Sequence, residues 1–298
     1  MLHYRADLRT CCYMLVTTTL FATQWYYGFH WLIYGFYLFL SISVSVMTHN
    51  HQHLNMWKSK PLNVLTDWWL TVFYGVPIFT WIPTHNRNHH KFVNREGDTT
   101  ATYRHTEENN LLSLLSYPSV SGYNQFKESI IPYMSKLKKT NASTYYENWA
   151  QVVVLFTWII GFLLLDWQKA LLYVVIPQQV SAFTVLIFNY VQHVHTDEES
   201  KYDHSRNFMV LNYTLFNNGY HTAHHERAGI HWSFLPAEHA KIAHLISPDL
   251  IEKTFLGFIF RVYVMGTFSE KFKTFNRREA RIIQPVKIAA QVEEEVYV

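Results

Sequence analysis

The sequence predicts an all-α, polytopic membrane protein with four transmembrane helices in two hairpins, interfacial helices, and a cytoplasmic helical cap that carries a histidine cluster. Three observations support this fold class. Four long stretches contain no Asp, Glu, Lys or Arg. Aromatic residues make up 17% of the 298-residue chain, which suits the belts found at membrane interfaces. Most of the clustered histidines follow directly after apolar stretches.

The first predicted hairpin consists of residues 10–28 and 29–48. A helix of about 20 residues covers ~30 Å, the thickness of the hydrocarbon core, so we expect two spans joined by a tight turn near Gly28. A signal peptide is the alternative, because Arg5 and Arg9 precede the apolar run. A second uncharged run follows at once without a small-residue cleavage site, which favours the hairpin.

Residues 61–83 form a different kind of apolar segment. Three prolines and Asp67 interrupt the segment, and Trp68, Trp69 and Trp81 lie within it. Prolines and a central acid suit a span poorly, whereas tryptophan favours the headgroup level of a bilayer. We predict an interfacial or re-entrant segment, with a third full span as the alternative.

The second predicted hairpin consists of residues 149–165 and 170–192, with Pro177 as a tolerated kink. The preceding segment, residues 84–148, is polar and has a basic excess, which indicates the cytoplasmic face by the positive-inside rule. Both hairpins then return to that side. The N-terminus, the C-terminus and the cap, residues 84–148 and 193–298, are expected in the cytoplasm.

The remaining features fit a single membrane-embedded domain over residues 1–298. Residues 251–268 mix apolar side chains with Lys253 and Arg261, which is typical of an amphipathic helix on a membrane surface. The acidic stretch 293–295 resembles a solvated tail. A net charge of +3 with scattered basic residues gives no reason to expect nucleic-acid binding.

Four groups of polar residues lie at or just beyond the cytoplasmic ends of the predicted membrane segments. The groups contain the following residues: His49 and His53; His85, His89 and His90; Asn189 and His193; His221, His224 and His225. The members of the pairs His49/His53 and Asn189/His193 are four residues apart, so each pair shares one helix face. Their common depth predicts one shared site.

Metal binding is the chemistry that this density of imidazole indicates. Nine histidines exceed the four ligands of a tetrahedral zinc site, so two metals of higher coordination number fit better. Imidazole suits iron, zinc and copper alike and does not select the metal. Asn189 can complete an unequal site directly or through water, and open positions at such a site favour oxygen chemistry.

The other histidines lie outside these four groups. We expect satisfied surface or interfacial imidazoles at the isolated positions His3, His30, His105, His204, His239 and His244. His51, His195 and His231 lie close to the clusters in sequence and stay unassigned.

Two other classes of protein are weaker alternatives. A histidine-rich metal transporter would place ionisable residues near the membrane midplane, yet the predicted spans lack Asp, Glu, Lys and Arg. A zinc hydrolase of the common kind would carry an HExxH motif, which this sequence lacks.

The motifs resemble those of the membrane fatty-acyl desaturase and hydroxylase superfamily over roughly residues 30–240. The similar segments are Thr48-His49-x-x-x-His53, His85-x-x-x-His89-His90, Gly219-Tyr220-His221-x-x-His224-His225 and His231-Trp232-Ser233-x-Leu235-Pro236. The resemblance implies four transmembrane helices and a cytosolic cap around a di-iron centre. It also implies nine histidine ligands and a water-linked asparagine, which are His49, His53, His85, His89, His90, His193, His221, His224, His225 and Asn189 here. Spacings in the first two boxes differ from those of some members, so the acyl-CoA subgroup is not implied.

The implied activity is O2-dependent oxidation of an unactivated C–H bond in a fatty-acyl or related lipid chain, with desaturation to an alkene as the leading expectation. A hydroxylase, an acetylenase and a terminal-alkene-forming decarboxylase use the same ligands and stay open. Electrons are expected from a ferredoxin, a rubredoxin or a cytochrome b5 type of donor, since no heme or flavin module is apparent in the sequence. Asp197 and Glu226 are candidates to hold ligand imidazoles by the other ring nitrogen.

Overall fold

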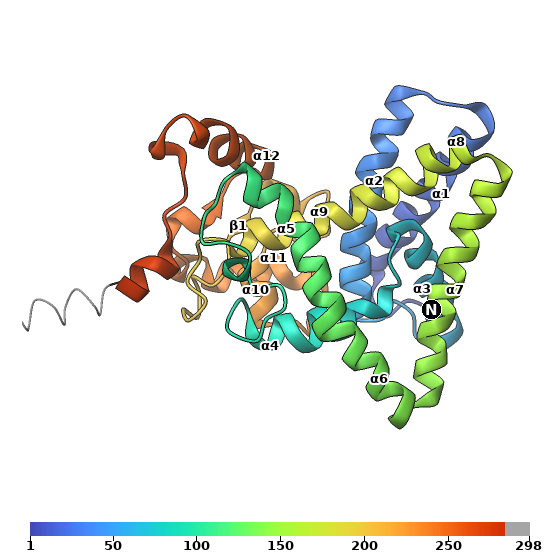
Figure 1. The fold of residues 1–298 in the computed structure, drawn as a ribbon, viewed down its shortest axis with the longest axis horizontal. Helices are drawn as coiled ribbons and strands as arrows, with labels where there is room; N and C mark the ends of the chain where they lie inside the picture. Colours follow the sequence, from blue (N-terminus) through green and yellow to red (C-terminus); the bar gives the residue numbers. More distant parts are fainter. Residues whose placement is uncertain (284–298) are drawn as a thin grey trace, which may run out of the picture.

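The computed structural model describes residues 1–283, and the acidic stretch 293–295 lies outside them. The described chain is mostly helical, as predicted. Its two named strands are β1 (Asn207–Phe208) and β2 (Ile251–Glu252), which pair in parallel over two residues each. The fold is therefore built by helix packing, with membrane helices beside a cap (Figure 1).

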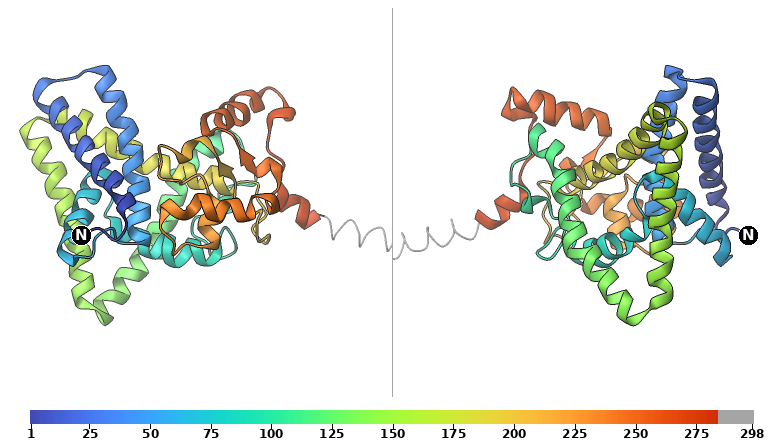
Figure 2. Two further views of the ribbon diagram at one scale, coloured as in Figure 1. Left: turned by 180° about the vertical axis from the view of Figure 1, so that it is seen from behind. Right: turned by 45° about the vertical axis from the view of Figure 1, so that its right-hand side comes forward.

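The first hairpin consists of α1 (Leu8–Tyr27) and α2 (Trp31–His53). Gly28 ends α1 with a φ of 90°, a conformation that costs glycine less than any other residue. The tight turn predicted near Gly28 is confirmed, and the two helices run side by side in opposite directions (Figures 1 and 2).

Three helices are long and apolar enough to cross a membrane. They are α2, α7 (Ala142–Leu165) and the continuous helix Trp167–His193. The last comprises α8 (Trp167–Ala170), the π-helical turn η6 (Leu171–Val175) and α9 (Ile176–His193). The chain is therefore suited to be an integral membrane protein.

Helix α7 shows the surface that such a protein turns toward lipid. Val153, Phe156, Ile160 and Leu164 are exposed along it, and Leu164 is 83% exposed. Water would strongly disfavour so much apolar surface on one long helix, whereas lipid would not.

Helix α1 has the length of a span but is more polar than the other three. The hydroxyls of Thr17, Thr18 and Thr19 donate to carbonyls four residues earlier at 2.7–2.9 Å, which satisfies them inside the helix. Phe21 packs edge-on against Phe73 and Phe162, so α1 lies within the helical bundle. A fourth span over α1 stays a prediction.

The segment predicted to be interfacial folds as α3 (Lys60–Tyr74), whose 15 residues are too few to span a bilayer. The helix packs against α2, α7 and α9. Gly75 ends it in the left-handed conformation, and an added Cβ there would lie 2.4 Å from Cβ of Gln178. This close approach holds α3 against the last span.

The cap consists of helices on both sides of the C-terminal half of α9. Its longer helical segments are η3 (Ile82–His89), α5 (Leu111–Gln125), η5 (Phe126–Ile130), α6 (Ile131–Thr140), α10 (His221–Glu226), α11 (Leu235–Ile242), α12 (Phe255–Ile259) and η11 (Phe260–Val264). Short helical turns complete it: α4 (His90–Phe92), η4 (Thr102–Arg104), η7 (Val210–Asn212), η8 (Trp232–Phe234), η9 (Ala243–Leu245), η10 (Pro248–Leu250), η12 (Met265–Thr267) and η13 (Glu270–Phe272). Two further turns precede the cap in sequence, η1 (Arg5–Asp7) and η2 (Ile78–Thr80).

The predicted amphipathic helix over residues 251–268 starts later than expected. Residues 251 and 252 belong to β2, and the helical part runs from Phe255 to Thr267. It buries Phe258 and Val262 and exposes Leu256 and Phe260, so the two-sided character is present.

Candidate metal centre

The first two histidine boxes reach the site from α2 and η3. His49 and His53 lie one turn apart at the end of α2. His85 and His89 lie in the π-helical segment η3, and His90 follows at the start of α4. The wider π-helical turn brings residues five apart closer to one helix face than an α-helix does. His85 and His90 therefore point to the same place, and His89 points to another.

The last box divides in the same manner on α10. His221 and His225 are four residues apart on one helix face, and His224 lies on another. The sequence pattern had grouped the histidines by box, whereas the structure divides two of the boxes between two sites.

All nine predicted histidines come together in two groups, each with ligand atoms within 4.8 Å of one another. The first group contains His49, His53, His85, His90 and His224, and the second contains His89, His193, His221 and His225. The groups adjoin, since the rings of His90 and His225 are 4.7 Å apart.

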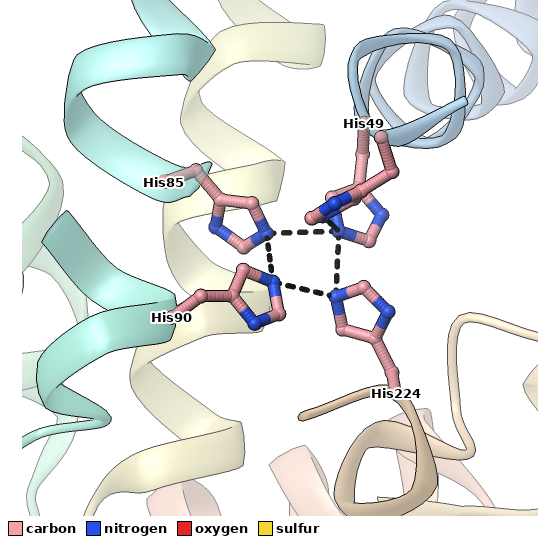
Figure 3. A group of neighbouring side chains, drawn as sticks. His49, His85, His90 and His224 are labelled. Carbon is pink, nitrogen blue, oxygen red and sulfur yellow. Dashed lines mark hydrogen bonds between the residues drawn. The ribbon is translucent and has the colours of Figure 1, made fainter. Parts of the chain in front are cut away.

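The nitrogen positions in the first group fit a metal of high coordination number. Figure 3 shows the Nε2 atoms of four rings at the corners of a square, with sides of 2.9, 3.0, 3.0 and 3.0 Å. Nitrogens bound at about 2.1 Å and at right angles around one ion lie about 3.0 Å apart, against about 3.4 Å in a tetrahedron. The fifth ring, His53, has its Nε2 3.2 Å from that of His49. Five such nitrogens exceed the four ligands of structural zinc.

The second group leaves a ring nitrogen without a partner. His193 and His221 bring their Nε2 atoms to 2.9 Å, and His225 approaches His221 at 3.0 Å. The Nε2 atom of His89 is buried and has no hydrogen-bond partner among the described residues. A buried polar atom of this kind needs a partner, and a metal ion supplies one.

Burial sets the protonation state of the rings outside the spans. It lowers the pKa of His85, His90, His221, His224 and His225 well below the usual histidine range, and the neighbouring imidazoles lower each further. The neutral rings keep a nitrogen lone pair, which is what a metal binds.

Asp98 holds one of these rings in place. Nδ1–H of His89 donates to the fully buried Asp98 carboxylate at 2.8 Å, and the Thr100 hydroxyl donates to the same carboxylate at 2.7 Å. Burial alone would raise the pKa of Asp98, but its interaction with His89 and the hydrogen bonds from Thr100 hold that pKa well below its usual range. The ionised carboxylate fixes Nε2 of His89 as the atom that faces the second group.

A backbone carbonyl holds the ring of His193 in the same way, since Nδ1–H of His193 donates to the carbonyl of His204 at 3.0 Å. His204 is itself buried, and its ring lies 5.4 Å from that of His225. The prediction that His204 is a surface or interfacial residue is wrong, because residues 203–206 fold back along the end of α9.

The two acids proposed for this role lie elsewhere. Asp197 accepts from Arg281 at 2.7 Å, and Glu226 lies 3.9 Å from Lys201 and 4.0 Å from His204. The positive φ of His195, 59°, turns the chain, and the acids after it pair with arginines near the end of the described chain. Asp98 was missed because no recognised motif contains it, although it lies eight residues after the second box.

Asn189 lies one turn before His193, as predicted, and Tyr117 fixes its side chain. Its amide nitrogen donates to the Tyr117 hydroxyl at 2.6 Å, and that hydroxyl donates to the carbonyl of Thr100 at 2.6 Å. Among the described residues, Oδ1 of Asn189 has no hydrogen bond, and Asn189 lines the same cavity as His221.

A cavity of about 310 Å3 extends from the two histidine groups between α2, η3, α5 and α9. Its mostly apolar lining consists of Val46, His49, Tyr74, Val76, Thr80, Trp81, Thr84, His85, Thr100, Gly122, Gln125, Phe126, Ile130, Ala182, Val185, Leu186, Phe188, Asn189, Gln192, Asn218 and His221. Trp81 contacts the rings of both His49 and His85, at 5.3 and 5.0 Å. Of the three tryptophans considered above, only Trp81 is among the lining residues.

Other histidines hold the surroundings of the site together. Nε2 of His51 lies 3.2 Å from Oδ1 of Asp67, which ties α2 to α3. Nε2–H of His231 donates to the buried Asp7 at 3.1 Å, which ties the cap to the N-terminal segment. His239 is also buried, so its prediction as a surface or interfacial residue is wrong as well.

The family model for fatty acid desaturases matches residues 23–255, which include all nine clustered histidines and Asn189. The chain belongs to the fatty acid desaturase family. No curated protein and no solved structure matches it. Membership makes this desaturase-family protein an oxidoreductase that acts on a fatty-acyl or related lipid chain, with histidine groups that can hold metal. A metal transporter and a zinc hydrolase do not fit that membership.

Asp98→Asn tests what holds His89. The neutral amide can still bond the ring but no longer enforces the required tautomer, so metal affinity is expected to fall 10- to 100-fold. Competition with a chelator, followed by metal analysis, measures this loss. Glu96→Gln, an exposed acid two residues away, is the matched control and should retain its metal. Equal affinities in the two variants would contradict the role of Asp98.

Proposed function

We propose that the protein is an O2-dependent di-iron enzyme that oxidises an unactivated C–H bond of a fatty-acyl chain, with an alkene as the product. The observation that carries the proposal is the cavity, whose mostly apolar walls are continuous with residues of both histidine groups. An elongated apolar substrate fits such walls, and metal binding accounts for the rings at one end.

The proposed ligands are the nine clustered histidines, with Asn189 acting directly or through water on the second group. The square of four nitrogens with a fifth beside it supports iron over tetrahedral zinc. When bound, two irons supply the oxidation of the C–H bond by O2 and two electrons.

The protein itself binds the chain, orients it and excludes water. Phe188, Val185 and Tyr74 supply apolar contacts along the cavity, and Trp81 lies between those contacts and the first histidine group. An acyl chain held by these side chains presents one pair of carbons to the histidine groups. A chain held in place can present two vicinal hydrogens in succession, as an alkene product requires.

The electron donor and the orientation in the membrane belong to the same proposal. We place four spans in the bilayer, with α1 as the fourth, and both termini and the histidine groups on the cytoplasmic side. Electrons come from a ferredoxin, a rubredoxin or a cytochrome b5 type of partner. Basic side chains of residues 86–139 offer such an acidic partner a docking surface.

Product analysis tests the reaction most simply. A host that expresses the protein and is fed defined fatty acids should accumulate a chain with one additional double bond, detected by mass spectrometry. His224→Ala should abolish the product, because it removes a corner of the nitrogen square, while exposed His244→Ala should leave product formation unchanged. An alcohol, an alkyne or a shortened terminal alkene would redirect the proposal to that activity.

Tyr117→Phe tests the proposed role of Asn189. Loss of the hydroxyl frees the amide to rotate away, so turnover should fall about tenfold or more. Because both residues act through one interaction, adding Asn189→Ala to Tyr117→Phe should cost little beyond Asn189→Ala alone. Tyr123→Phe, on the exposed face of the same helix, is the matched control. Fully additive losses in the double variant would contradict the pairing.

A further inference from the structure

The cavity carries no charged side chain. Its described lining residues include no Asp, Glu, Lys or Arg, and its polar groups away from the histidines are hydroxyls and amides such as Gln125 and Gln192. A water-soluble nucleotide thioester carries several phosphate charges, which proteins normally hold with arginines, lysines or helix N-termini. The lining therefore gives such a carrier group nothing to bind.

The mouth of the cavity is marked by Phe126, which is 56% exposed at the junction of α5 and η5. Lys127 follows Phe126 directly in sequence, and Arg104 reaches the nearby Glu128. Arg104 is already paired with both carboxylate oxygens of Glu128, at 3.0 and 2.8 Å. Lys127 packs over the ring of Tyr123 at 5.8 Å. The exposed ammonium of Lys127 suits a single carboxylate or phosphodiester rather than a polyphosphate.

An exposed apolar row on α5 leads to this mouth. Leu112, Leu115, Tyr123 and Phe126 lie at three- and four-residue steps or multiples of them, so they share one helix face. A second exposed row, on the helical segment that follows β2, consists of Leu256, Phe260, Val264 and Phe268.

Both helices pack on the end of a membrane span. Leu114 and Tyr117 of α5 share a buried cluster with Tyr190 and Val191 of α9, and Phe258 of α12 belongs to the same cluster. The two apolar rows therefore lie on helical segments that pack against the C-terminal half of α9 (Figure 2). Rows of this kind are stable against lipid and unstable against water.

We propose that the cavity takes its acyl chain laterally from the bilayer, past Phe126, and that the substrate is a membrane-dissolved amphiphile with one anionic group. A free fatty acid and a phospholipid both have this chemistry, and a water-soluble acyl thioester does not. The oxidation of that chain rests on the proposed function, whereas its binding can be measured separately.

Gly122 offers a way to close this entrance without disturbing the fold. It lines the cavity, and a Cβ added there would meet no atom within 4 Å. Gly161 has the same free space on the exposed face of α7, and it is not among the cavity-lining residues. Gly122→Phe should therefore obstruct the cavity, and Gly161→Phe is the matched control for the effect of a large side chain.

The test uses the full chain in lipid nanodiscs and three photoactivatable probes: a diazirine fatty acid, a phospholipid with the same acyl chain, and a non-hydrolysable thioether analogue of its coenzyme A ester. Labelled peptides are identified by mass spectrometry, which needs no turnover. The fatty acid probe, the phospholipid probe or both should label cavity residues more strongly than the thioether. Comparison of the first two probes shows which lipid the cavity takes. Gly122→Phe should reduce this labelling at least tenfold, with Gly161→Phe unchanged.

Equal or stronger labelling by the thioether, no labelling by any probe, or equal losses in the two glycine variants would each overturn the inference. The same samples, supplied with reductant and O2, keep this inference separate from the proposed function. Oxidation of the acyl chain of the thioether analogue alone would retain the proposed function and reject lateral entry. Labelling by a bilayer lipid without any oxidised product would retain lateral entry and reject the proposed function.

Discussion

Repulsion among buried lone pairs is the constraint on which the structure depends. Nine imidazoles meet in two adjoining groups, and burial lowers the pKa of five of them, which keeps those five neutral: His85, His90, His221, His224 and His225. In each group, several neutral rings turn their Nε2 atoms toward a common centre. These nitrogens cannot all form hydrogen bonds with one another, because each ring has only one proton to donate. A cation at each centre removes the conflict. The fold must therefore supply part of the free energy that holds the rings at these positions, and a bound metal would supply the rest.

The fold supplies its part through a few specific devices. The π-helical turn at η3 brings His85 and His90 together and sends His89 to the other group, which a regular α-helix would not do. Asp98 and the carbonyl of His204 then fix the rings of His89 and His193 through Nδ1. Helix α2 carries His49 and His53 to the site, and α9 carries Asn189 and His193. The cap closes over these side chains with α10.

Much of this architecture could be predicted from the sequence, because it rests on regular patterns. Uncharged runs of span length predicted α2, α7 and the helix that ends at His193, and the histidine boxes predicted which nine side chains gather. The tight turn at Gly28 followed from two such runs in direct succession. Helix α1 was the weakest of the predicted spans for a physical reason, since its threonines and Arg9 lower its hydropathy.

Other features could not be predicted, because they depend on contacts between distant segments. No pattern in the neighbouring sequence indicates that His89 bonds to Asp98, that Asn189 bonds to Tyr117, or that His204 is buried. Proximity in sequence suggested Asp197 and Glu226 instead, but Asp197 follows the left-handed residue His195 and pairs with Arg281, and Glu226 lies near Lys201 and His204. The division of two boxes between the groups depends on helix type, which spacing alone does not determine.

X-ray absorption at the iron edge of the purified, membrane-reconstituted protein tests the central claim most directly. Two irons per chain, each surrounded by five or six nitrogen and oxygen neighbours at about 2.1 Å, would agree with the two histidine groups. A preparation that is fully active with zinc alone, or that shows four-coordinate metal with sulfur neighbours, would contradict it.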